Sequence, residues 1–312
     1  MDQPLVSVIC LCYNHVRFVL ESLESVLNQS YRHIEMIIVD DASSDGSKEI
    51  IQNFLEEYPD VPFINLPNNV GNTTAFNQGL KMAKGKYVID LACDDVMLPD
   101  RIEKQVAFFE TQHERVGVIY SDAEYIDEEG KHIKFHFKKK RYEAKEGDIY
   151  KDLIGDYFIP PPTMMMRKKV LDELDGYDED LAYEDFDFWI RSSKMWHYAF
   201  QPELLTKIRK VTNSLSTQLY TKTDLQLNST IMVCEKIMEL NQEPEEDRAL
   251  VKRLKYEVRH AFLTGHRDQV MRMMEMLREL KGMTFLYYVL SAVNLGWNLT
   301  WLRRLIHLIK YG

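Results

Sequence analysis

Two pairs of adjacent aspartates each follow a short apolar run, where their carboxylates could hold a ligand. Asp94-Asp95 comes shortly after residues 87–91. Adjacent carboxylates repel each other unless a cation neutralises them. Mg²⁺ and Mn²⁺ bind through one or two carboxylates together with the phosphates of a substrate. The pair therefore indicates a divalent-metal site, and an exposed acidic turn before the helix that follows Pro99 is the other interpretation.

The second pair, Asp40-Asp41, follows the apolar residues 36–39. A carboxylate there can accept a hydrogen bond from the imide N–H of uracil or thymine, or from the donors of guanine. Tyr13, after the first apolar run, could stack on such a base or lie at the rim of the core. Residues 40–46 are also rich in turn formers. A phospho-accepting signalling domain clusters aspartates in the same way, but here the polar motifs continue far past residue 120.

A third acidic pair, Glu184-Asp185, directly precedes the aromatic residues Phe186, Phe188 and Trp189. A carboxylate beside aromatic groups can have a raised pKa, which suits a general base. Asp is also a favoured residue at the start of a helix. A base and a helix cap are therefore the two interpretations of this pair.

Alternating strand and helix patterns must position these carboxylates. Apolar runs typical of buried strands cover residues 6–12, 36–39, 63–66, 87–91 and 116–120, and helical spacing covers 18–27, 47–58, 73–83 and 100–111. This alternation predicts an α/β fold with a mostly parallel sheet between helices. Ligands bind beyond the carboxyl ends of such strands. We therefore expect Tyr13, Asp41 and Asp94-Asp95 to share one crevice.

The pattern changes after residue 120. A hairpin is expected over residues 125–137, and a helix over 185–194, whereas residues 221–280 are helical without strand alternation. Two parts are predicted: residues 1–219, with halves at about 1–120 and 121–219, and a helical region over 220–312.

Charge separates these two parts. The net charge of the chain is −10, and residues 1–219 hold 25 Lys/Arg against 38 Asp/Glu. An acidic body repels nucleic acid, so we expect no nucleic-acid partner. It also repels a phosphate-bearing substrate unless a cation offsets the charge. The four cysteines form no CxxC pair, and we expect buried reduced thiols in a cytoplasmic protein.

The last 32 residues, 281–312, contain no Asp or Glu, and residues 283–302 are uncharged. That length could span a bilayer, but Asn294, Gly296 and Asn298 interrupt it. Its Trp and Tyr residues suit a membrane interface better. We expect a contact with the inner face of the cell membrane, with a helix packed on the protein or in a homodimer as the alternative.

Taken in order, these segments resemble family 2 glycosyltransferases with the GT-A fold. The matching segments are VSVICLCYN (6–14), IVDDASSDG (38–46), NVG and AFNQG (69–79), GKYVIDLACDD (85–95), and GYD with YED (176–185). The resemblance covers roughly residues 4 to 215. Each motif is loose, but five in this order and spacing are specific.

The resemblance implies an inverting, metal-dependent transfer of one sugar from a nucleotide sugar to an acceptor hydroxyl. Asp41 and Tyr13 would contact the base of a UDP-, dTDP- or GDP-sugar, and Asp94 the ribose or sugar. Asp95 would ligate Mn²⁺ or Mg²⁺. Asp185 would be the catalytic base, with Glu184 lining the donor site beside it. The acceptor would be a glycan or a lipid-linked glycan of polysaccharide or glycolipid biosynthesis.

The chain departs from the family pattern at three points. Phe76 stands where many relatives have Arg, and Val211 where many have a His near the metal; Arg209 or Lys210 could supply that charge instead. The Gln-x-x-Arg-Trp motif of processive synthases is absent, which favours transfer of single sugars. A non-catalytic nucleotide- or glycan-binding protein is the alternative. A nucleotidyltransferase is disfavoured, because residues 6–15 contain no glycine.

Overall fold

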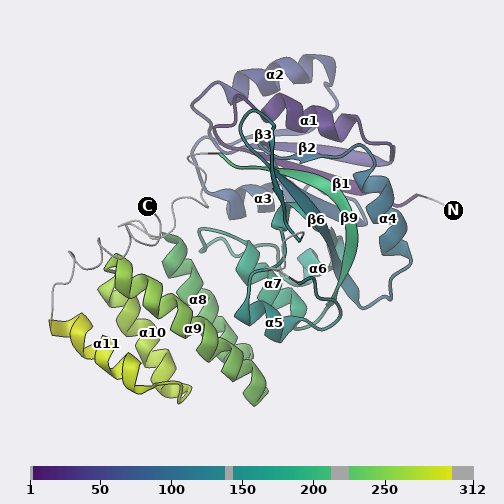
Figure 1. Ribbon diagram of the computed structural model, residues 1–312. Coiled ribbons are helices and arrows are strands. Elements are labelled where there is room, and N and C mark those ends of the chain that lie inside the picture. Colours follow the sequence, from purple (N-terminus) through teal and green to yellow (C-terminus); the bar gives the residue numbers. More distant parts are fainter. Residues whose placement is uncertain (1–2, 138–142, 212–224, 297–312) are drawn as a thin grey trace. The chain divides into compact units, whose positions relative to one another are not determined.

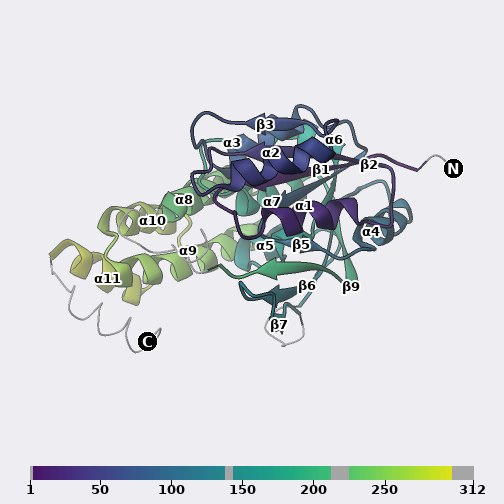
Figure 2. The ribbon, with the colours of Figure 1, turned by 90° about the horizontal axis from the view of Figure 1, so that it is seen from above.

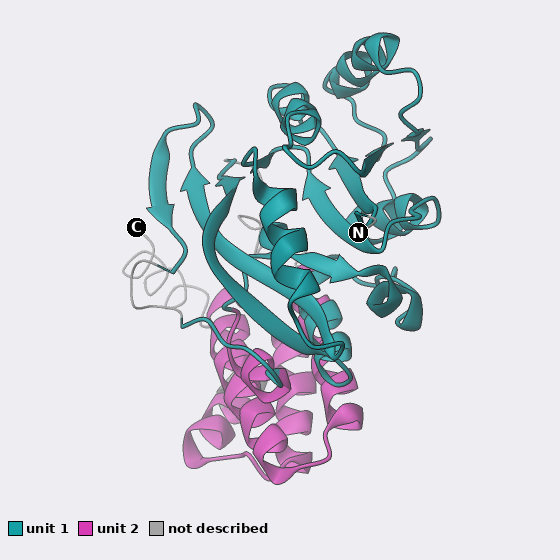
Figure 3. Cartoon of the chain, turned by 90° about the vertical axis from the view of Figure 1, so that its right-hand side faces the viewer, with its two compact units in different colours: residues 1–149, 158–212 teal, residues 150–157, 213–312 magenta. Residues whose placement is uncertain are grey.

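The structure is a computed structural model of the 312-residue chain and describes residues 3–137, 143–211 and 225–296. The chain divides into two compact units (Figure 3): residues 1–149 with 158–212, and residues 150–157 with 213–312. All candidate site residues belong to the first unit. The boundary expected at residue 219 lies outside the described residues and stays a prediction.

A nine-stranded sheet forms the centre of the first unit (Figure 1). Its strands are β1 (Val6–Cys12), β2 (Ile34–Asp40), β3 (Phe63–Asn65), β4 (Tyr87–Ala92), β5 (Val96–Met97), β6 (Val116–Ile126), β7 (His132–Phe135), β8 (Met165–Arg167) and β9 (His197–Arg209). The order is β3-β2-β1-β4-β8-β6-β9-β5, with β7 paired to β6. Strands β3, β2, β1 and β4 are parallel. Strand β8 runs antiparallel to both β4 and β6 and so joins the two halves.

One face of the sheet is covered by α1 (Val19–Leu27), α2 (Ser47–Glu57) and α4 (Arg101–Glu110) (Figure 2). These helices share a hydrophobic cluster with alternate residues of the strands, such as Tyr87, Ile89 and Leu91 of β4. Successive strand residues point to opposite faces. The side chain of Asp90 therefore points to the other face of the sheet.

That other face is covered by α3 (Asn72–Leu80), which lies close to the strands because of a glycine. A Cβ added to Gly79 would come within 2.6 Å of Ile9 Cγ2 and 3.2 Å of Val39 Cγ2. The close approach at Gly79 lets the first turn of α3 reach the carboxyl ends of β1 and β2. Phe76 of α3 is fully buried against this face.

The second half of the first unit is organised by the long parallel pair β6 and β9. Their pairing shifts on either side of Asp122, because β9 has extra residues there. Helices η1 (Pro161–Thr163) and α6 (Lys168–Glu173) flank β8, and α7 (Asp185–Ser193) follows. Acidic Asp185 and Asp187 occupy the first turn of α7 and Arg191 its last, which suits the helix dipole.

The second unit is helical over its described residues. It contains α5 (Tyr150–Gly155), α8 (Leu225–Leu240), α9 (Pro244–Thr264), α10 (Arg267–Glu279) and α11 (Phe285–Gly296). Helix α9 begins with a capping box between Glu243 and Glu246 and ends at Gly265, whose φ is 90°. Within residues 3–137, 143–211 and 225–296, no helix combines the length and the apolar character needed to cross a membrane.

The α/β architecture predicted from the sequence is confirmed, with a parallel first half and a mixed second half. All four cysteines are buried and free, as expected. The uncharged segment of residues 283–302 is described only up to residue 296, so the predictions for residues 297–312 lie outside the described residues.

Candidate functional site

The loops after β1 and β2 are held together by hydrogen bonds. Asn14 Oδ1 accepts the backbone N–H of Ser44 at 2.8 Å, and Ser43 Oγ accepts that of Asn14 at 2.9 Å. Asn14 and Ala42 both have positive φ, 58° and 59°, which is uncommon for residues other than glycine. The side chain of Tyr13 in the first loop is 46% exposed. Tyr13 is therefore available to a ligand and does not belong to the core.

Asp41 lies at the end of β2 and connects it to the start of α3. Its Oδ1 accepts the N–H of Val70 at 2.7 Å, and its Oδ2 that of Gly71 at 2.9 Å. Burial raises the pKa of Asp41, and these two hydrogen bonds act against that rise. Each carboxylate oxygen can accept a second hydrogen bond. Asp41 can thus organise the loop and still accept a donor from a ligand.

Asp94 and Asp95 lie just beyond β4, and their environments differ. Asp95 is 3% exposed, and its Oδ1 accepts the backbone N–H of Arg209 at 2.8 Å. Burial and the charge of Asp94 raise the pKa of Asp95 well above its usual range, whereas the Arg209 N–H and the Lys210 charge oppose the rise. Asp94 Oδ1 lies 4.0 Å from Nε2 of His15, whose Nδ1 is buried and bonds to none of the described residues.

Arg209 and Lys210 differ in how far the protein itself engages them. The Arg209 guanidinium donates to the carbonyl oxygens of Asp94, Asp127 and Glu128 and to the carboxylate of Glu21, and its side chain is 2% exposed. Of the two residues that the sequence offered as a cation for a diphosphate, Arg209 is therefore a structural clamp. Lys210 remains the candidate, because its charge acts on Asp95 and Asp94.

Glu184 and Asp185 begin α7, with Glu184 as the N-cap residue. Glu184 Oε2 accepts a hydrogen bond from Asn72 Nδ2 in the first turn of α3. Burial, then the charges of Glu184 and Asp90, raise the pKa of Asp185 well above its usual range. Asp185 Oδ1 is buried and has no hydrogen-bond partner among the described residues. This is the environment expected for a carboxylate that exchanges a proton with a ligand.

Asp90 is a member of this group that sequence reasoning missed. It lies in β4, its Oδ2 accepts the hydroxyl of Tyr177 at 3.3 Å, and burial and the charge of Glu184 raise its pKa. A charged residue inside the otherwise apolar run of residues 87–91 was the signal available. We refer to Asp90, Glu184 and Asp185 as the carboxylate group.

A second missed feature is the clamp that holds the segment before Glu184. Asn77 Oδ1 accepts the N–H of Tyr177 at 2.9 Å, and Asn77 Nδ2 donates to the carbonyl of Tyr177 at 2.8 Å. A Cβ on Gly176, whose φ is 75°, would lie 2.3 Å from Asn77 Oδ1. Phe76 stacks on Tyr177 with ring centroids 4.2 Å apart. Phe76 is thus a core residue, and the loss of an Arg contact expected at this position stays a prediction.

Hydrogen bonds connect several of the predicted site residues through one short segment. Asp41 bonds to the N–H of Gly71, and the next residue, Asn72, bonds to Glu184. Asp95 is tied to β9 instead, and no hydrogen bond of the described residues joins Asp95 to Asp41 or Asp185. The roles of Tyr13, Asp41, Asp94, Asp95, Glu184 and Asp185 stay predictions.

The described residues offer a metal ion only a partial set of ligands. No group of three or more His, Cys, Asp or Glu side chains within them surrounds a single metal position. Asp95 supplies a buried carboxylate whose charge is only partly offset. Mg²⁺ and Mn²⁺ bind in this way, through one or two carboxylates and the phosphates of a substrate. The residues therefore fit an ion that arrives with a diphosphate.

Comparison of sequences identifies relatives of this chain. Residues 7–175 match the model of glycosyl transferase family 2. An uncharacterised glycosyltransferase of Methanocaldococcus jannaschii is 36% identical over 194 residues, which cover 61% of this chain and 65% of that protein, slightly less than two thirds. A Bacillus subtilis glycosyltransferase provisionally assigned to teichuronic acid biosynthesis, TuaG, is 30% identical over 215 residues, 69% of this chain and 82% of that protein.

Comparison of structures establishes the fold. S. aureus TarS 1–349 in complex with UDP-GlcNAc has a TM-score of 0.67 at 18% identity and covers 98% of this chain and 89% of its own. The mannosyltransferase PcManGT from Pyrobaculum calidifontis, in complex with GDP-Man and Mn²⁺, has a TM-score of 0.60 at 15% identity and covers 99% and 82%. The predicted GT-A fold is thereby confirmed. The family model matches more than half of the 312-residue chain, and the chain therefore belongs to glycosyl transferase family 2.

Proposed function

We propose that this family 2 glycosyltransferase transfers a single sugar from a nucleotide sugar to an acceptor hydroxyl, with inversion at the anomeric carbon. The observation that supports the proposal most is the segment of residues 70–72, which bonds both to Asp41 at the end of β2 and to Glu184 at the start of α7. Asp41, which would bind the nucleotide, and Glu184, the neighbour of the proposed base Asp185, would then be held by adjacent residues of one segment.

The donor would bind along the loops after β1, β2 and β4. Asp41 would accept the imide N–H of the base, and the exposed ring of Tyr13 would stack on it. Asp94 would contact the ribose or the sugar. Lys210 would face the diphosphate, because its charge already acts on Asp94 and Asp95. UDP- and dTDP-sugars offer the imide N–H, and a GDP-sugar would offer the N–H donors of guanine instead.

A divalent cation, Mn²⁺ or Mg²⁺, would be held by Asp95 together with the diphosphate oxygens. The PcManGT structure contains Mn²⁺ with GDP-Man, which supports a metal in this chain as well. When bound, such an ion neutralises negative charge on the diphosphate. The backbone N–H of Arg209 holds the buried carboxylate of Asp95 in place.

In the proposed step, the acceptor oxygen attacks the anomeric carbon of the donor. The bond from that carbon to the diphosphate oxygen breaks, and its electron pair leaves with the nucleoside diphosphate. Asp185 takes the proton of the acceptor hydroxyl. Its raised pKa, caused by burial, Glu184 and Asp90, brings its basicity closer to what proton abstraction near neutral pH requires. Glu184 lines the donor side of the same group and is positioned by Asn72.

The acceptor would be a glycan or lipid-linked glycan of cell-surface polysaccharide biosynthesis, as the relationship to the Bacillus subtilis protein suggests. Helix α11 supports a contact of the second unit with the inner face of the cell membrane or with a second copy of the chain. Phe285, Leu286, Tyr288 and Val289 are 84%, 53%, 57% and 41% exposed. Tyr287, by contrast, is buried and bonds to Arg259 at 2.7 Å.

A screen of nucleotide sugars tests the proposed reaction. The full chain is incubated with UDP-, dTDP- and GDP-sugars, with Mn²⁺, Mg²⁺ or EDTA, and release of nucleoside diphosphate is measured with and without pooled glycan acceptors. We expect metal-dependent release from one nucleotide class, and an inverted anomeric configuration of the product by NMR. Stabilisation by a nucleoside diphosphate without any release would favour the non-catalytic alternative, and a retained configuration would contradict the inverting mechanism.

Vesicle binding tests the surface of α11. Partition onto anionic vesicles is compared between the wild type and a Phe285→Glu, Leu286→Glu double variant, with Met195→Glu in the first unit as an exposed control. The wild type and the control should bind and the double variant should not. Equal partition of all three, with a dimer lost only in the double variant, would favour the contact between two copies.

A further inference from the structure

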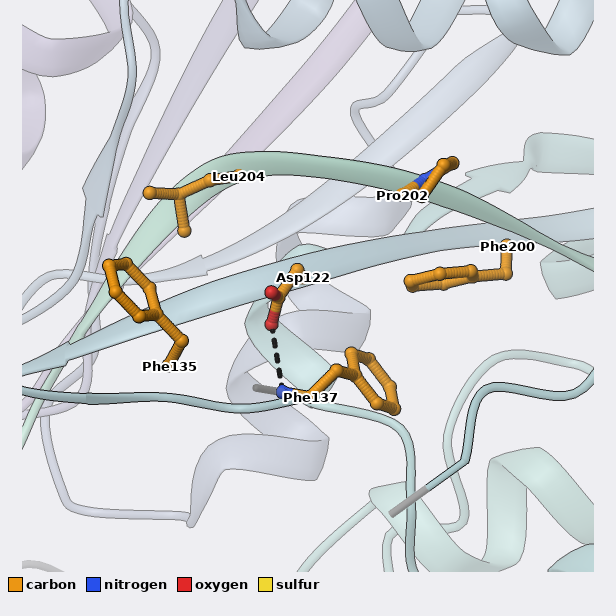
Figure 4. A pocket seen from close by; sticks show the side chains of 6 residues that line it. All are labelled: Asp122, Phe135, Phe137, Phe200, Pro202 and Leu204. Carbon is orange, nitrogen blue, oxygen red and sulfur yellow. Dashed lines mark hydrogen bonds between the residues drawn. The ribbon is translucent and has the colours of Figure 1, made fainter. Parts of the chain in front are cut away.

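A pocket of about 410 Å³ lies on the ribbon formed by β6, β7 and β9 (Figure 4). Its lining consists of three aromatic rings, two aliphatic side chains and one carboxylate: Phe135, Phe137, Phe200, Pro202, Leu204 and Asp122. Figure 4 shows Asp122 between Phe135 and Phe137, with the three residues of β9 opposite. Small-molecule sites have volumes of roughly 300–1,000 Å³ and a similar mixture of apolar walls and few polar groups.

The pocket results from the irregular pairing of β6 with β9. Ser121 pairs with Gln201, but the next residue, Asp122, pairs with Leu204, so that Pro202 and Glu203 form a bulge. Proline is tolerated at such a bulge because it has no N–H to contribute to the ladder. Bulges redirect side chains and are frequent next to functional sites. Phe200, Pro202 and Leu204 are alternate residues of β9 and therefore face the same side of the sheet.

Asp122 has one oxygen engaged and one available. Its Oδ1 accepts the N–H of Ala123 at 2.8 Å and that of Phe137 at 3.1 Å, while Oδ2 accepts no hydrogen bond from a described residue. A ligand that displaces water from this oxygen has to supply a donor of its own, because an unpaired carboxylate oxygen is costly once it is cut off from water. The occupant should therefore be a hydrogen-bond donor with apolar faces. None of the six lining residues is cationic, so the lining offers no charge partner to a phosphate or another anion.

A sugar ring meets these requirements, because its C–H faces can pack on aromatic rings while its hydroxyls donate to a carboxylate. The position of the pocket also fits a glycan. Leu204 and Arg209 are five residues apart on β9, about 17 Å in an extended strand, and Arg209 holds Asp95. A ligand in the pocket would thus lie a few sugar units away from the diphosphate site.

We propose that this pocket binds a neutral or amino-bearing sugar unit of the acceptor, away from the point of transfer. This inference rests on the proposed transfer to a glycan. It assigns Asp122 as the hydrogen-bond acceptor for the sugar and Phe137, Phe200 and Leu204 as its apolar walls. Uronate- and phosphate-bearing units are excluded by the charge of Asp122.

The test is binding of the full chain to an array of immobilised tetrasaccharides of four classes: neutral hexose, N-acetylhexosamine, free hexosamine and uronate-containing. Leu204→Trp fills the pocket without leaving a cavity. Asp122→Asn keeps an oxygen for the Phe137 N–H and removes the charge. Met195→Trp places the same large side chain at an exposed position outside the pocket and is the matched control.

We expect the wild type and Met195→Trp to bind at least one neutral or amino-bearing class. Binding should fall at least tenfold in Leu204→Trp, and should fall in Asp122→Asn most strongly for free hexosamine. The melting temperature of each variant, with and without UDP and Mn²⁺, reports folding and the donor site separately. Pocket variants should keep the donor response of the wild type.

Three results would overturn the assignment: no binding of any tetrasaccharide by the wild type, equal binding by folded Leu204→Trp, or preference for the uronate class. If any of these results occurs while the response to UDP and Mn²⁺ is intact, the assignment of the pocket is wrong and the proposed transfer reaction is not contradicted. Glycan binding that depends on the pocket, in a chain with no response to any nucleoside diphosphate, contradicts the proposed transferase and leaves the pocket supported.

Discussion

Asp95 and Asp185 are both buried carboxylates with raised pKa values, but the other groups that act on them differ. Burial and the charge of Asp94 raise the pKa of Asp95, while the backbone N–H of Arg209 and the cations Lys210 and Arg101 oppose the rise. Around Asp185, burial, Glu184 and Asp90 all act in the same direction and favour the protonated form. Under the proposed function, the same residue type has two tasks: Asp95 is ionised beside a bound cation and a diphosphate, and Asp185 takes a proton.

This contrast shows why the number of acidic residues says little about their roles. A carboxylate supported by N–H groups and cations is suited to holding charge, and one surrounded by other carboxylates is suited to exchanging protons. The following variants test whether Asp95 and the carboxylate group have separate functions.

Asp185→Asn should have the largest effect. The amide cannot accept the proton of the acceptor hydroxyl, and general-base catalysis contributes roughly 10²–10⁴-fold to a rate. We expect kcat for transfer to fall by that factor, measured by release of nucleoside diphosphate in the presence of acceptor. Asp180→Asn, at an exposed position five residues before Asp185, is a control of equal chemistry. Wild-type turnover by Asp185→Asn would show that Asp185 is not the base.

Asp95→Asn should act through the donor instead. The amide still accepts the N–H of Arg209 but carries no charge for a cation. We expect the metal concentration needed for half-maximal activity to rise by roughly 10–100-fold, a range found for weaker perturbations of metal sites. Initial rates over a Mn²⁺ series measure this. If the metal requirement stays unchanged and only kcat falls, Asp95 acts in proton transfer with the carboxylate group and does not bind the metal.

Asp90→Asn should change the pH dependence. It removes a negative charge that raises the pKa of Asp185, so the acid limb of the rate profile should move to lower pH by up to about one unit, equivalent to 1.4 kcal/mol. The introduced amide can still bond to the hydroxyl of Tyr177, which makes the substitution conservative. A profile that keeps its midpoint while kcat falls would indicate a structural role alone.

The same variant has a consequence for stability. Raised folded pKa values mean that the folded wild type binds protons more tightly than the unfolded chain. Its stability therefore falls as the pH rises from about 4, the unfolded carboxyl value, through the raised values. Asp90→Asn removes part of that loss and should be more stable than the wild type at about pH 8 but not at about pH 4. Urea denaturation at both pH values measures the difference.

Lys210→Gln should have the smallest effect. An exposed charge pair is worth little, so the KM for the donor should rise by roughly two- to fivefold, with unchanged thermal stability. Lys134→Gln is the matched control, because the ammonium groups of Lys134 and Lys210 lie 4.7 and 4.8 Å from the ring centroid of Tyr125. Equal effects of both variants would mean a general change in local charge and no specific contact with the diphosphate.

The positions of Asp41, Asp94 and Asp95 could be predicted from the sequence because each follows a buried strand within a few residues. The carboxyl ends of parallel strands share one edge, so short-range patterns were sufficient. Asp90 was missed for the opposite reason. Its contact Tyr177 and the nearby charge of Glu184 are about ninety residues away along the chain, and no local pattern indicates that contact.

The difference between Arg209 and Lys210 also required the structure. Adjacent residues of a strand point to opposite sides, but the acceptors that enclose Arg209 come from α1, the end of β4 and the β6–β7 turn. Strand β8 and the pocket beside Pro202 are likewise products of pairings between distant segments. Sequence reasoning thus found the carboxylates at the ends of the strands and missed the groups that change their pKa values.

The central claim is that Asp95 binds the metal and Asp185 does not. It is tested most directly by the affinity for Mn²⁺ in the presence of UDP, measured by electron paramagnetic resonance. We predict that Asp95→Asn loses at least roughly tenfold in affinity, and that Asp185→Asn binds Mn²⁺ as the wild type does. An equal loss of Mn²⁺ affinity in both variants, or a loss confined to Asp185→Asn, would contradict this claim.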